Sequence, residues 1–384
     1  MIKAIDIFSG CGGVSCGLSL AGFKVKAAVD NEPKAVRVYK NYLPLSKVNV
    51  LNKDVHEVSG QELLKSAKIK EGELYLFAGC PPCQNFSRQN VKNKDKTEEE
   101  RKELLFQFLR LIEEIYPPFV LMENVQGITS EFNKPILEEF LGRLENKDNP
   151  INCRYKVYKK VLNAANYGVP QQRMRFVLHA VRADIYEELI DANILFGLPQ
   201  PTHNKDGSNG LDPWTTVAQA IGDLPPIAAG ECYSGEEIKN HKCADLSPVN
   251  LERIQLIRAN GGSRTGLPNR LVLECHKKVD KDGNIFKGRT DVYGIMDANK
   301  PSPTITGGCL CYSKGRYGHY AQDRAISIRE AARLQTFPDD FEFSNNLGEA
   351  ALQIGNAVPI KLVEASGEEF LKTIKKLEKI RKNK

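Results

Sequence analysis

The sequence predicts an α/β protein with a doubly wound, mixed but mostly parallel sheet and a second, smaller domain inserted into it. Apolar strand candidates alternate with helix candidates through the first half of the 384-residue chain. The composition then changes near residue 197, where Gly, Pro and Asn become frequent. Helical periodicity returns after residue 325, which indicates that the end of the chain completes the first domain.

The expected strands are short apolar segments followed by turns or helix signals. They are residues 2–8, 23–29, 48–54, 74–78, 119–122 and 175–181. One helix is expected to follow the first Gly-rich turn and to end at Leu20, and a second covers residues 34–43. A third is expected from Thr97 to about Ile115, and Thr97 and Glu100 form a capping box at its start. Ligands of doubly wound sheets lie at the carboxyl ends of strands, and the motifs described below follow such ends.

The predicted domain bounds follow the same changes in pattern. We expect residues 1–196 to form the first domain together with residues 325–384, and residues 197–324 to form the second. Helical periodicity is clear at 328–337 and again from Val358 to the end.

The composition is that of an ordinary globular protein, with 41% apolar and 27% charged residues. No apolar segment approaches the ~20 residues that span a bilayer, and we expect a cytoplasmic protein with no membrane partner and mostly reduced cysteines. The last 14 residues carry the whole net charge of +6. Only local patches of charge can therefore indicate nucleic-acid binding.

The first motif is DIFSGCGGVSCGL, residues 6–18, which joins a strand to a helix through a Gly-rich turn. A dinucleotide fingerprint needs glycine where Ser15 stands, so an adenosine ligand without phosphates fits better, and S-adenosylmethionine is the common one. Asp30 ends the second strand and can accept hydrogen bonds from ribose hydroxyls, and Asp54 follows the third. Alternatively, Gly10 and Gly12 only make a tight turn and Asp30 only caps a helix.

The second motif is GCPPCQNFS, residues 79–87, directly after a strand. Three interpretations compete. Cys80 and Cys83 have the spacing of a redox dithiol, they could form half of a metal site, or one of them acts alone as a nucleophile. The metal interpretation is weak because Cys309 and Cys311 have the wrong spacing for a second half, and His241, Cys243, Cys275 and His276 match no standard zinc pattern.

Two further motifs favour a lone nucleophile. ENV, residues 123–125, places a carboxylate at another strand end, and PQQRMRF, residues 170–176, places Arg173 and Arg175 two apart where a strand begins. A thiol, an acid and an arginine suit attack on a pyrimidine ring. The thiol adds to carbon 6, the acid holds the ring nitrogen and exocyclic amine, and the arginine holds the ring carbonyl. A redox dithiol needs neither Glu123 nor Arg175.

These motifs, followed by REAARLQTFPDDF and QIGNAVP in the same order, resemble those of the cytosine-5 DNA methyltransferases over nearly the whole chain. The resemblance implies that Cys83 is the nucleophile, that Glu123 and Arg175 contact the base with Arg173 in support, and that Cys80 only packs. It implies S-adenosylmethionine as cofactor, S-adenosylhomocysteine as product, no metal, and a sheet of the methyltransferase type. The implied cofactor positions are Phe8, Gly10, Gly12, Asp30, Asn31, Asp54, Val55, Asn356, Ala357 and Val358. Asn31 departs from the family, which often has a bulky apolar residue there.

DNA contacts are expected in three places. Ser87 and Arg88 follow the nucleophile in a polar, Lys-rich stretch, and residues 258–289 hold eight Lys or Arg against three acids. Residues 280–290 and 307–316 resemble the family's recognition loops, which points to Lys287, Arg289, Gly307 and Gly308. The alternative is an ordinary exposed loop and scattered surface charges.

The resulting prediction is a monomeric enzyme that transfers a methyl group to carbon 5 of cytosine in a specific duplex DNA sequence, through a Cys83 adduct on a flipped base. Residues 197–324 would recognise the target, and a separate restriction endonuclease could be a companion. One alternative is tRNA cytosine-5 methylation, although over a hundred residues between QQRMR and REAARLQ favour DNA. The other is a non-catalytic DNA-binding protein on the same fold.

Overall fold

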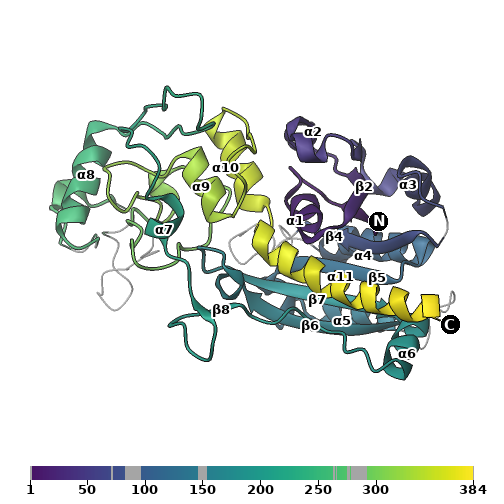
Figure 1. Ribbon diagram of the computed structural model, residues 1–384. Coiled ribbons are helices and arrows are strands. Elements are labelled where there is room, and N and C mark those ends of the chain that lie inside the picture. Colours follow the sequence, from purple (N-terminus) through teal and green to yellow (C-terminus); the bar gives the residue numbers. More distant parts are fainter. Residues whose placement is uncertain are drawn as a thin grey trace. The chain divides into compact units, whose positions relative to one another are not determined.

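A computed structural model of the protein describes residues 2–70, 72–82, 97–145, 154–262, 264, 266–274, 277 and 292–383. The chain forms two compact units (Figure 1). The first comprises Met1–Gly168, Met174–Asp212 and Ala357–Lys384, and the second comprises Val169–Arg173 and Pro213–Asn356. The predicted bounds differ, because residues 325–356 lie in the second unit and residues 197–212 in the first.

A seven-stranded sheet forms the centre of the first unit, in the order β3-β2-β1-β4-β5-β7-β6. The strands are β1 (Lys3–Ile7), β2 (Lys24–Val29), β3 (Asn49–Leu51), β4 (Leu74–Gly79), β5 (Phe119–Val125), β6 (Tyr155–Asn163) and β7 (Met174–Arg182). β1 to β5 pair in parallel, whereas β7 runs antiparallel to both β5 and β6. The predicted mixed, mostly parallel sheet is confirmed.

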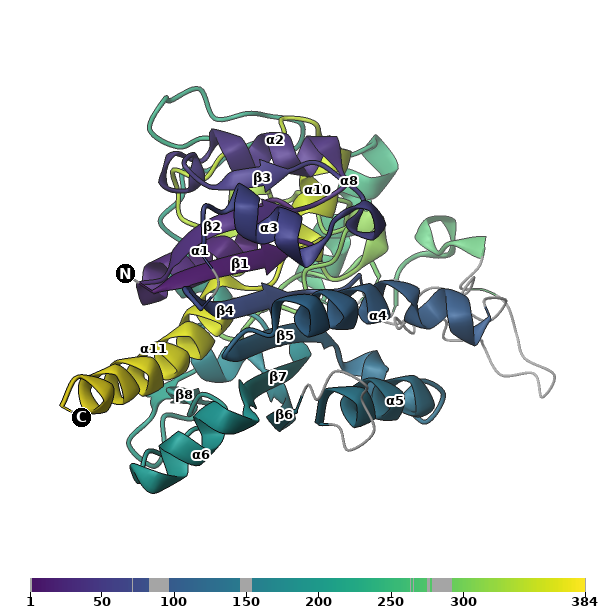
Figure 2. The same cartoon turned by 90° about the vertical axis from the view of Figure 1, so that its right-hand side faces the viewer.

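Helices cover both faces of this sheet. The buried residues of α3 (Gly60–Ser66), α4 (Glu98–Ile115) and α5 (Lys134–Glu145) share a core with the strands, and Phe108 of α4 stacks on Phe77 of β4 at 5.4 Å. The predicted capping box of Thr97 and Glu100 starts α4. Figure 2 shows α4 and α5 on one side of the strands. On the other side, Phe370 of α11 (Ile360–Asn383) packs 5.7 Å from Phe119 of β5.

In the first unit, the last helix of the chain packs against the first helix. α11 packs along α1 (Gly13–Ala21), and a Cβ at Gly17 would lie only 2.7 Å from the Val363 Cβ, so the two helices approach through a residue without a side chain. α2 (Pro33–Asn41) follows β2, and α6 (Ala183–Asp191) follows β7. A short pair, β8 (His203–Asn204) and β9 (Asp212–Pro213), comes last.

The second unit has little regular structure. Its helices are α7 (Val217–Ile221), α8 (Pro248–Ala259), α9 (Ile328–Leu334) and α10 (Leu347–Asn356). α9 packs against α7 and α10, which is why residues 325–356 belong here. The buried pair Arg324–Glu330, with a 2.7 Å contact, fixes the start of α9. In the described parts of both units, no helix combines the length and apolarity required to cross a membrane.

Candidate active site

The proposed cofactor residues of the first unit gather at the carboxyl ends of three neighbouring strands. Gly10 and Gly12 follow β1 with φ angles of 53° and 98°, which favour glycine. The Gly10 N–H donates to Asp30 Oδ2 at the end of β2, at 2.7 Å. Asn31 donates to Asp54 Oδ2, beyond β3, at 3.5 Å. The sheet order therefore brings together residues that are far apart in sequence.

The Asp30 carboxylate holds the backbone of the turn in place. Its carboxylate accepts the Gly10 N–H and, at 2.9 Å, the Glu32 N–H, while burial raises its pKa. Glu32, which the sequence reasoning did not single out, is the exposed acid at this strand end and caps α2 by accepting the Lys34 N–H at 3.2 Å. A second acid two residues after Asp30 was the signal that could have identified it.

The positions around β3 have different environments. Asp54 starts a single 3₁₀ turn by accepting the His56 N–H at 3.0 Å, and its hydrogen bonds to His56 lower its pKa. Val55 is buried in the core, so its side chain is 4% exposed. Phe8 is partly buried and takes a positive φ of 61°, which turns the chain sharply into the Gly-rich turn.

Two features of the Gly-rich turn fit a bound ligand. The Ser9 hydroxyl is buried and has no hydrogen-bond partner among the described residues. A Cβ built on Gly10 would meet no atom within 4 Å, so open space adjoins the turn. A buried polar atom beside open space suits a ligand that carries hydrogen-bonding groups, as an adenosyl group does.

A buried carboxyl group beneath this turn was also missed from the sequence. Asp6 of β1 is fully buried and accepts hydrogen bonds from the Ser15 N–H at 3.1 Å and the Ser15 hydroxyl at 2.6 Å. The Tyr39 hydroxyl donates to Ser15 Oγ at 2.7 Å. Burial raises the pKa of Asp6 to about 7. A charged residue type within the apolar strand KAIDI was the available signal.

Glu123 and Arg175 form an ion pair at the end of β5. Arg175 Nε lies 2.8 Å from Glu123 Oε1, and the two side chains are 11% and 12% exposed. Antiparallel pairing of β5 with β7 produces this contact, because it places Arg175 opposite Val125, two residues beyond Glu123. Glu123 and Val125 belong to β5 itself, whereas the sequence placed ENV after the strand.

Cys80 lies beside this pair. It lines a small cavity of about 10 Å³, the space of one water molecule, together with Glu123 and Val358. Burial, followed by the Glu123 charge, raises the pKa of the Cys80 thiol well above its usual range. Cys80 therefore stays a thiol at neutral pH and is a poor nucleophile.

The backbone leading toward Cys83 is anchored to the same strand. Asn124 of the ENV motif donates to the Pro81 carbonyl at 3.1 Å, and the Cys80 N–H donates to the Ile7 carbonyl at 3.2 Å. The predicted nucleophile Cys83 and the predicted DNA contacts Ser87 and Arg88 lie outside the described residues.

The sequence placed Arg173 and Arg175 together where a strand begins, but only Arg175 lies in the strand. β7 begins at Met174, so Arg173 precedes the strand and belongs to the second unit. Arg173 is 2% exposed and donates to the carbonyls of Ile305, at 2.6 Å, and Gly355, at 2.9 Å. The physical reason is that two buried carbonyls need a donor, and a long guanidinium group can serve both. Arg173 therefore positions backbone.

The remaining predicted residues divide between the units. Gly307 and Gly308 lie in the second unit, in the loop that Arg173 fixes, and a Cβ on Gly307 would contact the Leu352 side chain of α10 at 2.9 Å. Asn356 is the last residue of α10, whereas Ala357 and Val358 begin the last segment of the first unit. Lys287 and Arg289 lie outside the described residues.

Of the four residues considered as zinc ligands, His241 and Cys243 are engaged in other contacts, and Cys275 and His276 lie outside the described residues. His241 lies between the Pro225 carbonyl at 2.8 Å and the Ser327 hydroxyl at 2.9 Å, and the Cys243 thiol donates to the Ala228 carbonyl at 3.1 Å. Across the described ranges, no three His, Cys, Asp or Glu side chains are grouped to hold a metal ion.

Comparison with solved structures defines the class of fold. The chain is similar to a protein described as a DNA modification methyltransferase encoded within a prophage (E. coli), with a TM-score of 0.65 and 24% identity over 98% of this chain and all of that one. It is also similar to the Dnmt2 methyltransferase of S. pombe, with a TM-score of 0.56 and 15% identity over 99% of both chains. The fold is therefore that of methyltransferases.

Sequence comparison then shows the family. The model of the C-5 cytosine-specific DNA methylases matches residues 2–372. The Type II methylase M.HgiDII of Herpetosiphon aurantiacus is 34% identical, over 98% of both chains, and the Type II methyltransferase M1.HphI of Haemophilus parahaemolyticus is 33% identical, over 96% of this chain and 86% of that one. The chain belongs to the C-5 cytosine-specific DNA methylase family and is a DNA cytosine-5 methyltransferase.

Proposed function

We propose that this enzyme methylates carbon 5 of a cytosine within a specific duplex DNA sequence, through a transient covalent bond from Cys83 to the base. The observation that carries the proposal is the Glu123–Arg175 pair, which lies next to Cys80 at the end of β5. Asn124 ties the backbone that leads into Cys83 to the same strand. An acid and a guanidinium group side by side can contact two neighbouring edges of one pyrimidine.

The proposed chemistry starts with the Cys83 thiolate adding to carbon 6 of a cytosine that is flipped out of the duplex. Glu123 in its protonated form donates a hydrogen bond at the ring nitrogen and stabilises the charge that develops there, while Arg175 holds the ring carbonyl. Carbon 5 thereby becomes electron-rich and takes up a methyl group. Loss of the carbon-5 proton to water or hydroxide then expels Cys83 as the thiolate and restores the aromatic ring.

S-adenosylmethionine would supply the electrophilic methyl group and leave as S-adenosylhomocysteine. Residues at the carboxyl ends of β1 to β3 would hold it, with Ala357 and Val358 contributing from the last segment of the first unit. Glu32, the exposed acid after β2, is the better candidate for the ribose hydroxyls, because the Asp30 carboxylate already accepts two backbone N–H groups. We assign Asp30 to shaping the turn.

The biological setting is also a proposal. The two relatives compared above carry Type II names, which supports a role in restriction and modification beside a separate endonuclease. Recognition of the target sequence falls to the second unit, including Gly307 and Gly308. Monomeric state and cytoplasmic location stay predictions.

Trapping the covalent intermediate tests the reaction. Wild-type enzyme incubated with a 5-fluorocytosine duplex and S-adenosylmethionine should yield an adduct on Cys83 by mass spectrometry, because fluorine cannot leave as a proton does. Cys83→Ser should form no adduct and transfer no methyl group, yet bind S-adenosylhomocysteine normally. Cys80→Ala, the matched control, should retain near-normal turnover. Turnover in Cys83→Ser, or an adduct elsewhere, contradicts the assignment.

A direct comparison of substrates tests the tRNA alternative. We expect the labelled methyl group to enter duplex DNA and not tRNA. Transfer to tRNA alone would show that the assignment of DNA as the substrate is wrong, although the proposed Cys83 chemistry could still hold.

A further inference from the structure

In the first unit, the His56 ring lies between two carboxylates. Its Nδ1–H donates to Asp54 Oδ1 at 2.5 Å, and its Nε2 lies 3.2 Å from Glu103 Oε1 on α4. Carboxylate oxygens accept hydrogen bonds, so both ring nitrogens face acceptors and the orientation of the ring is defined. The sequence motifs did not single out His56, which follows the proposed cofactor residue Asp54 by two positions.

The two oxygens of the Asp54 carboxylate have different surroundings. Oδ1 accepts twice from His56, from the backbone N–H at 3.0 Å and from the ring at 2.5 Å. Oδ2 receives the Asn31 amide at 3.5 Å, which is longer than a normal N–H···O hydrogen bond. The Asp54 side chain is 44% exposed, so Oδ2 can also accept from a ligand. His56 therefore fixes one oxygen and leaves the other to an incoming donor.

The backbone of this turn is held separately, from α4. Arg110 of that helix donates to the carbonyls of Val55 and Val58, at 3.0 Å each. One guanidinium group thus fixes both ends of the turn that follows Asp54. Because these contacts do not involve the His56 side chain, loss of its ring should loosen the Asp54 carboxylate while the turn itself stays folded.

We propose that His56 is a positioning residue for the adenine of the cofactor: its ring holds the Asp54 carboxylate so that Oδ2 accepts the exocyclic amine. The inference rests on the proposed binding of S-adenosylmethionine at the ends of β1 to β3, and it adds a residue that acts on the cofactor only through Asp54. The amine donates and an ionised carboxylate only accepts, so the two groups are complementary. The hydrogen bonds from the His56 backbone and ring lower the pKa of Asp54 and so favour the ionised form.

Selectivity for the exocyclic amine tests this role. The probe is the 6-deamino analogue of S-adenosylhomocysteine, in which hydrogen replaces the amine, and calorimetry gives the Kd of each ligand. Wild type should bind S-adenosylhomocysteine about 5- to 10-fold more tightly than the analogue, whereas His56→Ala should bind the two within about 2-fold. His56→Asn should restore most of the preference, because its side-chain amide keeps a donor near the position of Nδ1.

Lys53→Gln is the matched control. It removes an exposed charge next to Asp54 that pairs with Glu62 at 2.7 Å, and it should keep the wild-type preference for the amine. A His56→Ala protein that keeps this preference, even if it binds both ligands more weakly, overturns the proposal, and so does a His56→Asn protein that loses as much preference as His56→Ala. Wild type that binds neither ligand would overturn the proposed cofactor as well. If the selectivity changes as expected but wild type transfers no methyl group to DNA, only the proposed function fails.

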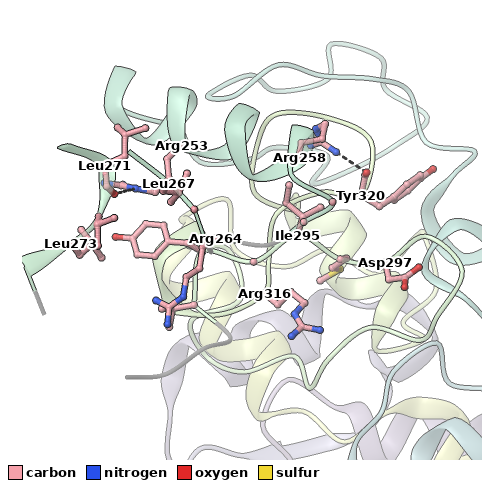
Figure 3. A pocket seen from close by; sticks show the side chains of 18 of the residues that line it. Arg253, Arg258, Arg264, Leu267, Leu271, Leu273, Ile295, Asp297, Arg316 and Tyr320 are labelled. Atoms are coloured by element: carbon pink, nitrogen blue, oxygen red, sulfur yellow. Dashed lines mark hydrogen bonds between the residues drawn. The ribbon is translucent and has the colours of Figure 1, made fainter. Parts of the chain in front are cut away.

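DNA binding by the second unit supplies an independent measurement. That unit contains an open pocket of about 1160 Å³, lined by Arg264 and Arg316 among others (Figure 3). Most of its lining falls in the stretches 258–289 and 307–316, which are expected to contact DNA. His56 belongs to the first unit, so His56→Ala should bind a DNA duplex with the wild-type Kd. Equal losses of affinity for DNA and for S-adenosylhomocysteine would indicate general damage to the protein and contradict the proposal.

Discussion

Arg173 and Arg175 are two residues apart, yet their partners differ in kind. Arg173 donates to two buried carbonyls, whereas Arg175 meets the Glu123 carboxylate. A carbonyl left without a donor costs folding free energy, whereas a carboxyl group can take up a proton when its charged partner is removed. The first arginine should therefore matter for stability and the second for turnover.

Glutamine at each position separates these roles. Arg173→Gln should lower the free energy of unfolding by about 2–5 kcal/mol, because two buried carbonyls lose their charged donor. Arg175→Gln should lower it less, because Glu123 can take up a proton, and should reduce the single-turnover rate about 100-fold, because the developing charge loses a preorganised donor. Urea denaturation and single-turnover methyl transfer measure the two effects. A stable, slow Arg173→Gln together with an unstable, active Arg175→Gln would reverse the assignment.

Among the elements, α1 begins without a capping side chain of its own. Its N-cap residue, Gly12, takes a positive φ and cannot cap the helix, and Asp6 from the preceding strand accepts the Ser15 N–H in its place. The same helix start shapes the Gly-rich turn. The cap therefore lies in the core, and its charge state depends on pH.

The pH dependence of stability tests this cap. Burial raises the pKa of Asp6 from 3.8 to about 7, so between these values the folded protein keeps a proton that the unfolded chain releases. The free energy of unfolding should then fall as pH rises from about 4 to 7, by up to about 1.4 kcal/mol per unit, and Asp6→Asn should lack this contribution. Denaturation across this range measures the difference between the two proteins. Other titrating groups, such as Asp30, cancel in that difference, so parallel curves would contradict the prediction.

Elements were easier to predict from the sequence than their packing. Apolar strands, the Thr97 capping box and the order of the motifs all act locally, and the sheet followed from them. The bounds of the second unit could not be predicted in this way. The periodicity of residues 328–337 indicates a helix, but it does not indicate which other helices that helix packs against. Likewise, Arg173 depends on Gly355, 182 residues away, and the distinct roles of Asp30 and Glu32 depend on how the turn folds back.

At the scale of the whole molecule, the first unit depends on the last segment of the chain. α11 covers α1 and one face of the sheet, and its contact with Gly17 fixes the helix that follows the Gly-rich turn. Its buried apolar side chains are Ile360, Leu362, Val363, Phe370, Ile374 and Leu377. Their burial is worth of order 10 kcal/mol, which is comparable to the whole stability of a typical domain, about 5–15 kcal/mol.

Two truncations test this dependence. Removing residues 357–384 should unfold the first unit and abolish S-adenosylhomocysteine binding, because the exposed face of the sheet and α1 lose their cover. Removing only residues 379–384 should leave the melting temperature and binding nearly unchanged, since that end is mostly exposed and loses the surface pair Arg381–Glu188, worth about 0.5 kcal/mol. Circular dichroism melts and calorimetry of both variants give the comparison. A folded, ligand-binding protein without residues 357–384 would mean that the sheet and the Gly-rich turn form without the returning helix.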